Sequence, residues 1–176
     1  MEQQVILVDQ EDQSTGVAEK MDAHRKGLLH RAFSVFIFNR KGEMLLQRRS
    51  LHKYHSGGLW TNACCSHPQP GEETEAAAIR RLQEEMGFET ALEKVFDLVY
   101  KAEFENGLTE HEFDHVFAGE YEGAIQFAAD EVMDYCYKNM PDIRDSLQSH
   151  PQRYTVWFRL AFAKLEDWWK KRYSSN

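Results

Sequence analysis

The feature that most constrains the fold of this chain is a change in hydrophobic period at residue 72. Before that point, short segments such as residues 33–38 place bulky apolar residues at alternate positions, which is the period of a β-strand. From Glu72 to Met86 the apolar residues recur instead at helical intervals, acidic residues occupy the first turn, and Gly87 follows as a stop. The apolar face consists of Ala78, Leu82 and Met86. The sequence therefore predicts a helix over residues 72–86.

Turn signals place further strands on both sides of this helix. Residues 39–42 (Asn-Arg-Lys-Gly) have turn composition, so residues 33–38 and 43–48 are expected to form a hairpin. Asn106-Gly107 predicts the turn of a second pair, 94–104 and 110–120. Other expected elements are a strand at 5–8 and helices near 141–149 and 155–172. We expect an α/β (α+β) fold, with a mixed sheet flanked by helices.

Composition excludes several classes of protein. The 176 residues are 42% hydrophobic and 28% charged, enough for one compact domain over residues 1–176, and no linker divides them. A formal charge of −8 argues against broad nucleic-acid binding. The sequence has no apolar run of about 18 residues, so no membrane span is predicted, and no targeting segment is recognisable. Three cysteines, two of them adjacent, favour reduced thiols in the cytoplasm. We expect a monomer or a weak homodimer.

The run Trp60-Thr-Asn-Ala-Cys-Cys-Ser-His-Pro68, followed by the predicted helix, carries the most information about function. It resembles the WTN-x-x-C-x-H-P signature of type I isopentenyl-diphosphate isomerases, followed by that family's altered Nudix helix, and the likeness covers most of the chain. An ordinary Nudix box reads G-x5-E-x7-R-E-U-x-E-E-x-G-U. Aligning its last glycine on Gly87 matches Glu72, Arg80, Leu82, Glu84 and Glu85. Ser66 then replaces its first glycine, and Arg81 replaces a glutamate.

The replacement by Arg81 bears on the reaction, because a Nudix hydrolase groups several carboxylates around Mg²⁺ to activate water. The resemblance implies instead that the chain interconverts isopentenyl diphosphate and dimethylallyl diphosphate. It also implies a Nudix-like fold and Mg²⁺ bound by Glu85 and the backbone carbonyl of Cys65. The basic positions that would bind the substrate diphosphate are Lys20, Arg49, Lys53 and Arg81.

A second divalent metal, Mn²⁺ or Zn²⁺, is implied by imidazole and carboxylate groups spread along the chain. The matching positions are His24, His30, His67, Glu110 and Glu112. Glu110 and Glu112 are two residues apart, so on a strand both project to one face and can reach one ion. Taken one at a time, each histidine is more simply read as a surface or structural residue.

Cys65 and His67 are also two residues apart, so on an extended segment both face the same way and Cys64 faces the opposite side. The resemblance implies that Cys65 and Glu112 lie on opposite faces of the five-carbon unit, one donating a proton and one accepting it. Tyr100 would assist Glu112. Between the two proton transfers a tertiary carbocation would form. The ring of Trp157 would stabilise this cation by around 2 kcal/mol when desolvated.

Other interpretations of the same residues remain open. Arg80–Glu84 and Arg81–Glu85 have the spacing of ordinary helix surface pairs. Residues 111–115 match the H-E-x-x-H zinc protease motif, but that motif needs a helix, and this segment has strand periodicity. The whole chain is also compatible with a Nudix pyrophosphohydrolase or with a catalytically silent module that binds metal or diphosphate.

Overall fold

The computed structural model describes residues 2–173, and its order of elements follows the predicted change of period. Four of its strands precede residues 60–68: β1 (Gln4–Val8), β2 (Ser14–Glu19), β3 (His30–Phe38) and β4 (Met44–Arg49). The other strands are β5 (Trp60–Thr61), β6 (Cys64–Ser66), β7 (Glu93–Glu103), β8 (Thr109–Glu120) and β9 (Val132–Lys138). The helices are α1 (Lys20–Lys26), α2 (Thr74–Met86), α3 (Met140–Ser149), α4 (Val156–Tyr173) and the 3₁₀ turn η1 (Pro151–Arg153).

Strand β3 is the centre of the sheet. It runs parallel to β8 from the pair His30–Glu112 to the pair Phe38–Glu120, and its other edge pairs with β6. Residues Phe33–Phe38 are buried on both faces, as expected of a strand with neighbours on each side. Within the described residues, all nine strands belong to one mixed sheet, which confirms the predicted fold class.

The expected hairpin between residues 33–38 and 43–48 is only partly correct. The turn is present, with the Asn39 side chain accepting from the backbone of Lys41 and Glu43, but β3 and β4 share a single ladder pair, Phe38–Met44. Because β8 and β6 occupy the edges of β3, β4 pairs instead with β9 and β5. The second predicted pair, β7 and β8, forms an antiparallel hairpin as expected.

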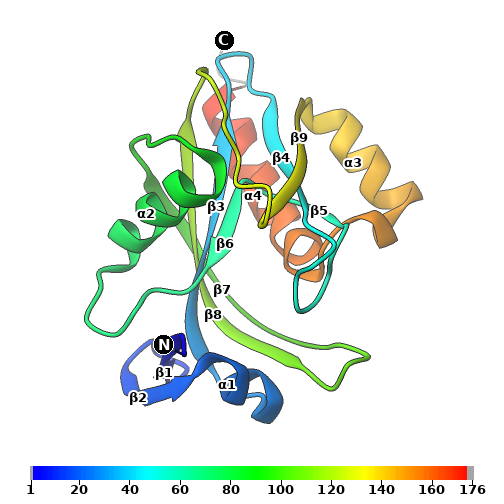
Figure 1. The fold of residues 1–176 in the computed structure, drawn as a ribbon. Helices are drawn as coiled ribbons and strands as arrows, with labels where there is room; N and C mark the ends of the chain where they lie inside the picture. Colours follow the sequence, from blue (N-terminus) through cyan, green and yellow to red (C-terminus); the bar gives the residue numbers. More distant parts are fainter. Residues whose placement is uncertain (1, 174–176) are drawn as a thin grey trace.

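Helices cover both faces of the sheet (Figure 1). Phe33, Val35 and Ile37 of β3 share a core cluster with α2, whereas Phe36 and Phe38 share another with α3 and α4. The alternation of β3 thus supplies both cores. Helix α2 begins at Thr74, two residues later than predicted, and β2, α1 and β9 were not predicted. In the described part of the chain, no helix is long and apolar enough to cross a membrane.

Gly87 ends α2 in the left-handed conformation, at φ 77°, and a methyl group there would overlap the backbone carbonyl of Gln126. We expect Gly87→Ala to lower the free energy of unfolding by more than the about 1–2 kcal/mol of left-handed strain alone. Gly107 has a similar φ of 81° but open space around it, so Gly107→Ala measures the cost of the left-handed backbone conformation without any overlap. Urea unfolding of both variants checks this, and equal losses would show that the overlap is relieved without cost.

Candidate active site

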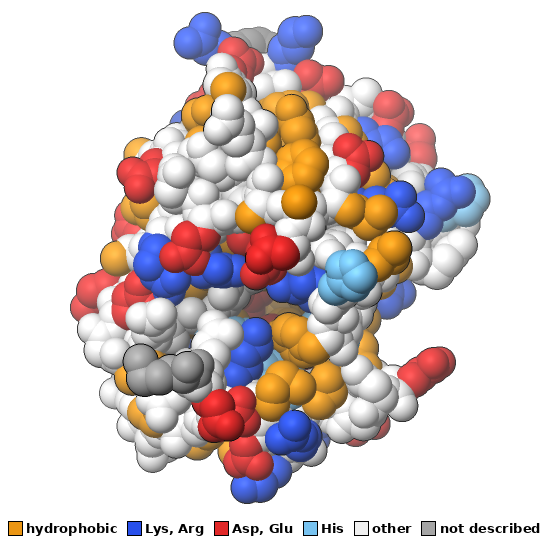
Figure 2. Space-filling model, in the orientation of Figure 1, with side chains coloured by type: hydrophobic (Ala, Val, Ile, Leu, Met, Phe, Trp, Pro, Cys, Tyr) orange, Lys and Arg blue, Asp and Glu red, His pale blue; other side chains and the backbone are white. Residues whose placement is uncertain are grey.

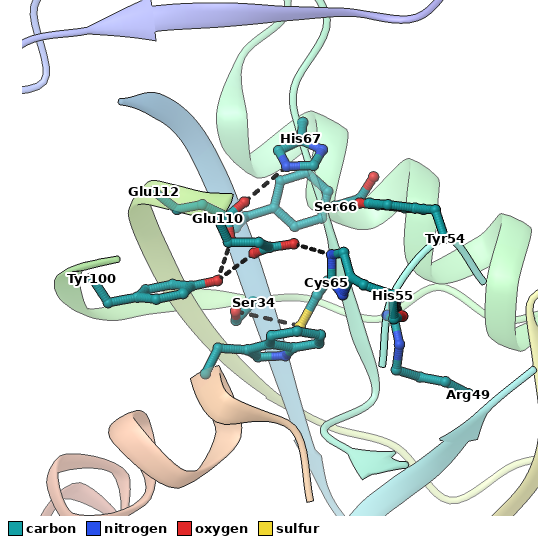
Figure 3. A pocket seen from close by; sticks show the side chains of 12 residues that line it. Ser34, Arg49, Tyr54, His55, Cys65, Ser66, His67, Tyr100, Glu110 and Glu112 are labelled. Atoms are coloured by element: carbon teal, nitrogen blue, oxygen red, sulfur yellow. Dashed lines mark hydrogen bonds and ion pairs between the residues drawn. The ribbon is translucent and has the colours of Figure 1, made fainter. Parts of the chain in front are cut away.

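Strand β8 supplies the acidic half of the site through its alternation. Glu110, Glu112 and Asp114 all project to one face and are nearly fully buried. The parallel register places Glu112 beside His30, and the antiparallel register places it beside Tyr100. The Tyr100 hydroxyl lies within hydrogen-bond distance of both glutamates, 2.7 Å from Glu110 Oε2 (Figure 3).

Three buried histidines meet these carboxylates, as expected from the sequence. His24 comes from α1, His30 from β3, and His67 from the segment after β6. His30 Nε2 lies 3.2 Å from His67 Nε2 and 3.4 Å from Glu112 Oε2, and His67 Nε2 lies 2.8 Å from the same Glu112 oxygen. His24 Nε2 lies 3.7 Å from Glu110 Oε1. The five predicted ligands are therefore brought together.

The hydrogen bonds of the histidine rings fit a metal ion at their centre. His24 Nδ1 lies 2.6 Å from the carbonyl of Lys20, and His30 Nδ1 lies 2.8 Å from that of Leu28. A carbonyl only accepts, so each Nδ1 carries a proton, and in the neutral ring Nε2 presents its lone pair to the cluster. The buried Nε2 of His24 has no hydrogen-bond partner. Burial also lowers the pKa of His67, which keeps that ring neutral and able to bind a metal.

The two glutamates differ in charge. Burial and the neighbouring Glu110 carboxylate raise the pKa of Glu112 to about 7. For Glu110, burial opposes ionisation, but the neighbouring Glu112, His24 and His55 hold its pKa well below the usual value. The protein alone therefore places a proton at Glu112 near neutral pH, on a group that can exchange it.

Cys65 faces the site from β6, and its neighbour Cys64 does not, as the alternation predicts. Cys64 is fully buried in the core with α2. The Cys65 sulfur lies 3.4 Å from Ser34 Oγ and 3.2 Å from Asn62 Oδ1. Burial, together with the Asp114 carboxylate, raises the pKa of the Cys65 thiol, so the thiol keeps its proton.

One cavity joins these groups (Figure 3). Cys65 borders it from β6, Tyr100 and Glu112 from β7 and β8, and Trp157 from the start of α4. Trp157 is 4% exposed, and the Arg49 guanidinium carbon lies 5.1 Å from its ring centroid, so the ring already contacts one cation. The arrangement can deliver a proton and remove one between side chains that are mostly buried.

The predicted basic residues gather at an adjoining pocket, which opens in the hollow of Figure 2. Its lining includes Lys20, Arg49, Lys53, Arg81 and Glu85. Arg49, Cys65 and His67 border both this pocket and the cavity lined by Tyr100, Glu112 and Trp157. A phosphate end and a hydrocarbon end of one small substrate could therefore be held side by side.

The two candidate helix pairs have different surroundings. Arg80 binds Glu72 through two hydrogen bonds, of 2.7 and 2.9 Å, as well as Glu84, and so supports the loop before α2. Arg81 reaches Glu84 at 2.6 Å and Glu85 at 2.7 Å, and it borders the basic pocket. The surface-pair interpretation holds for Arg80, whereas Arg81 takes part in the pocket.

The residues of the H-E-x-x-H match lie on β8, not on a helix. His111 Nδ1 lies 3.1 Å from the carbonyl of Gly27, and His115 Nε2 lies 2.9 Å from Asp12. Neither histidine joins the candidate metal groups among the described residues. The helix that a zinc protease of this type requires is absent from this segment.

Several site residues were not predicted from the sequence. Asp114 continues the alternation of Glu110 and Glu112 and could have been found from it. Ser34 accepts from Cys65 and donates to Asp114 at 2.7 Å. Glu131 pairs with Lys53 and lies 3.4 Å from Arg81. The loop histidine His55 has no periodic signal.

Comparisons with known proteins agree with this geometry. The NUDIX domain family model matches residues 28–160. The isopentenyl-diphosphate Delta-isomerase of Pectobacterium atrosepticum is 50% identical over 167 residues, 95% of this chain and 93% of that protein. Isopentenyl-diphosphate Delta-isomerase 2 of Photorhabdus laumondii is 48% identical over 173 residues, 96% of this chain and 98% of that protein.

Solved structures support the fold. DR0079 from Deinococcus radiodurans superposes with a TM-score of 0.70 at 17% identity, covering 84% of this chain and 90% of its own. The MutT protein of Methanosarcina mazei gives a TM-score of 0.65 at 21% identity, covering 84% and 96%. At such identities the likeness concerns the arrangement of sheet and helices.

Proposed function

The chain belongs to the NUDIX domain family and, within it, to the isopentenyl-diphosphate Delta-isomerases, and on that basis we propose how its site interconverts isopentenyl diphosphate and dimethylallyl diphosphate. One observation carries the proposal. A protonated thiol, Cys65, and a carboxyl group, Glu112, border the same cavity from different strands. Moving a double bond by one position needs a proton added at one carbon and removed at another.

Cys65 and the pair of Glu112 and Tyr100 are the proton-transfer groups. An alkene is a very weak base, so the donor must act where water does not compete for its proton. Cys65 is partly buried and Glu112 is 6% exposed, which meets that condition. Tyr100, hydrogen-bonded to Glu112, holds the carboxyl group in place and supplies a hydroxyl on the same side of the cavity. Either Cys65 or Glu112 can make the first proton transfer, since the reaction runs in both directions.

Trp157 stabilises the tertiary carbocation that forms between the two transfers. Its ring borders the cavity beside Cys65 and Glu112, and the guanidinium of Arg49 already lies over it. A cation held against a desolvated indole gains about 2 kcal/mol. The ring therefore favours the charged species over either neutral isomer.

The basic pocket binds the diphosphate end. Lys20, Arg49, Lys53 and Arg81 supply four positive charges around it. Glu85 is 4% exposed and borders the same pocket beside Cys65, so its carboxylate and the Cys65 carbonyl would hold Mg²⁺ there. Mg²⁺ when bound would neutralise part of the diphosphate charge. Because Arg81 replaces one glutamate of the Nudix box, the helix has fewer carboxylates to group around Mg²⁺ than a hydrolase.

The cluster of His24, His30, His67, Glu110 and Glu112 suits a second divalent ion, Mn²⁺ or Zn²⁺. Oriented imidazole lone pairs and two carboxylates are donors that such ions accept. The ion when bound would stabilise the ionised form of Glu112. Ser66, which replaces the usual glycine of the family, is not among the described residues with positive φ, so the backbone there does not require glycine.

The proposal is tested by incubating purified, reduced protein with isopentenyl diphosphate and Mg²⁺, with Mn²⁺ or Zn²⁺ in parallel. Dimethylallyl diphosphate and free phosphate are both followed over time. Formation of dimethylallyl diphosphate without phosphate is the expected result. Phosphate release would contradict it in favour of a hydrolase, and tight pyrophosphate binding without turnover would indicate a silent binding module.

Substrate binding is expected to weaken above about pH 8 because of Lys20. Burial, with repulsion from Lys53, lowers the pKa of Lys20 to about 8, so the side chain loses its charge as the pH rises through that value. The KM for isopentenyl diphosphate should rise above pH 8 by up to about tenfold per pH unit. Lys20→Met should show a higher KM that changes little between pH 7.5 and 9.5. A wild-type KM independent of pH over this range would remove Lys20 from the binding site.

A further inference from the structure

We propose that His55 is a positioning residue of the metal centre, donating a hydrogen bond that fixes Glu110 in the orientation needed to bind the ion. The inference rests on the proposed histidine and glutamate site, whose five predicted ligands do not include His55. The ring of His55 nevertheless lies close enough to His24 and Glu110 for the three to hold an ion together, so its role as a donor has to be distinguished from that of a ligand. His55 lies in the loop between β4 and β5, which also carries Lys53. Its ring is 5% exposed, and its Nε2 lies 2.5 Å from Glu110 Oε1.

The ring of His55 is held from several sides. It stacks on Phe104, with ring centroids 4.4 Å apart and an angle of 7° between the planes. Its edge meets Trp157 at 5.8 Å and 79°. Its Nδ1 lies 3.0 Å from the hydroxyl of Ser56. A ring confined in this way can hold the carboxylate it contacts in one orientation.

The partners of its two nitrogens distinguish His55 from the ligand histidines. His24 and His30 have a carbonyl at Nδ1, which forces the proton onto Nδ1 and leaves Nε2 free to bind a metal. His55 has a hydroxyl at Nδ1, which can donate, and a carboxylate at Nε2, which as an ionised ligand can only accept. Nε2 of His55 therefore carries the proton and cannot bind an ion.

Distances between ligand atoms lead to the same conclusion. With metal–ligand bonds of about 2.1 Å, neighbouring ligands of one ion lie about 3 Å apart or more. The separations of 3.2 Å for His30–His67 and 3.7 Å for His24–Glu110 fit this spacing, whereas His67 and Glu112, at 2.8 Å, would move slightly apart around an ion. The 2.5 Å between His55 and Glu110 is shorter still, which places the two groups in direct hydrogen-bond contact.

The backbone of His55 connects the metal centre to the diphosphate pocket. Arg49 Nη2 donates to the carbonyl of His55 at 3.1 Å. The loop closes tightly here: Ser56 has a left-handed φ of 56°, and a Cβ at Gly57 would lie 2.9 Å from the carbonyl oxygen of Leu51. One residue thus contacts a metal ligand through its ring and a phosphate-binding side chain through its backbone.

The test compares three substitutions at position 55 in the full-length protein. His55→Phe keeps a ring that can stack on Phe104 but removes the donor. His55→Gln restores an N–H at the place of Nε2, whereas His55→Asn places its amide nearer to the place of Nδ1. Binding of Mn²⁺ is measured by competition with a chelating dye, without substrate. His52→Phe, at an exposed position in the same loop, is the control.

We expect His55→Phe and His55→Asn to weaken Mn²⁺ binding by about 10–100-fold, as for other hydrogen-bond partners of metal ligands. His55→Gln and His52→Phe should bind Mn²⁺ about as tightly as the wild type. The metal-free phenylalanine and glutamine variants should unfold at similar urea concentrations, which separates positioning from folding.

Two results would overturn the proposal. Wild-type Mn²⁺ affinity in His55→Phe would show that His55 serves only in packing. Equal losses of Mn²⁺ affinity in His55→Gln and His55→Phe would show that His55 binds the metal directly. Failure of the underlying site is recognised separately, because a wild-type protein that binds no Mn²⁺ or Zn²⁺ would lack the metal centre itself. Isomerase activity of that wild-type protein, measured in the same preparation, would show whether the reaction depends on the centre.

Discussion

Replacing Cys65 with alanine is expected to lower kcat by about 10²–10⁴-fold, because that is the contribution of a positioned proton-transfer group and no other thiol borders the cavity among the described residues. The buried thiol is the group that can give or recover a proton on its side of the substrate. Turnover of isopentenyl diphosphate to dimethylallyl diphosphate measures the effect. The KM should change little, since Cys65→Ala leaves the backbone carbonyl and the basic side chains in place.

Cys64→Ala is the matched control for this experiment. Its side chain points into the core with α2, so the loss of sulfur should reduce the free energy of unfolding by about 1 kcal/mol and leave kcat close to wild type. If Cys65→Ala turned over at a near-normal rate, or if Cys64→Ala were the inactive variant, the assignment of the thiol would be wrong.

Glu112→Gln is expected to have the second large effect, also about 10²–10⁴-fold on kcat. The substitution keeps the shape of the side chain and its proximity to Tyr100, but an amide can neither accept nor release a proton at working pH. Because Glu112 is also a proposed metal ligand, the metal content of the purified variant is measured with the rate. The loss should persist when the rate is normalised to the fraction of protein that carries metal.

The control for Glu112→Gln lies on the same strand. Glu120→Gln changes a carboxylate at the far end of β8, outside both pockets, and should leave turnover and metal content unchanged. A rate that recovers fully once Glu112→Gln is saturated with metal would contradict a direct role in proton transfer and leave Glu112 only as a ligand.

The sequence predicted the parts of this site that follow a period. Alternation placed Glu110 with Glu112 on one face and separated Cys65 from Cys64, and the structure confirms both. Glu85, which was expected from the family resemblance and not from the helical period, is buried on α2. The family resemblance supplied the residues that no period connects, such as Lys20 and Trp157, and they border the pockets as expected.

What the sequence did not reveal depends on contacts between distant segments. Residues 33–38 were expected to pair mainly along the next strand, because a local turn was the only visible signal, whereas the parallel partner β8 lies about 80 residues away. Strand β2 and helix α1 are short and mostly polar, so their hydrophobic pattern is weak. His55 lies in an irregular loop, and only the folded chain brings its ring to Glu110.

The parallel pairing of β3 with β8 also affects the fidelity of folding. A slip of one residue between these strands would turn Glu112 to the opposite face and separate it from His30. An ion bound by residues of α1, β3, β8 and the segment after β6 would stabilise only the chain in which this register is correct. Metal binding would then stabilise the native alignment of the sheet relative to alternatives in which the register of β3 and β8 is shifted.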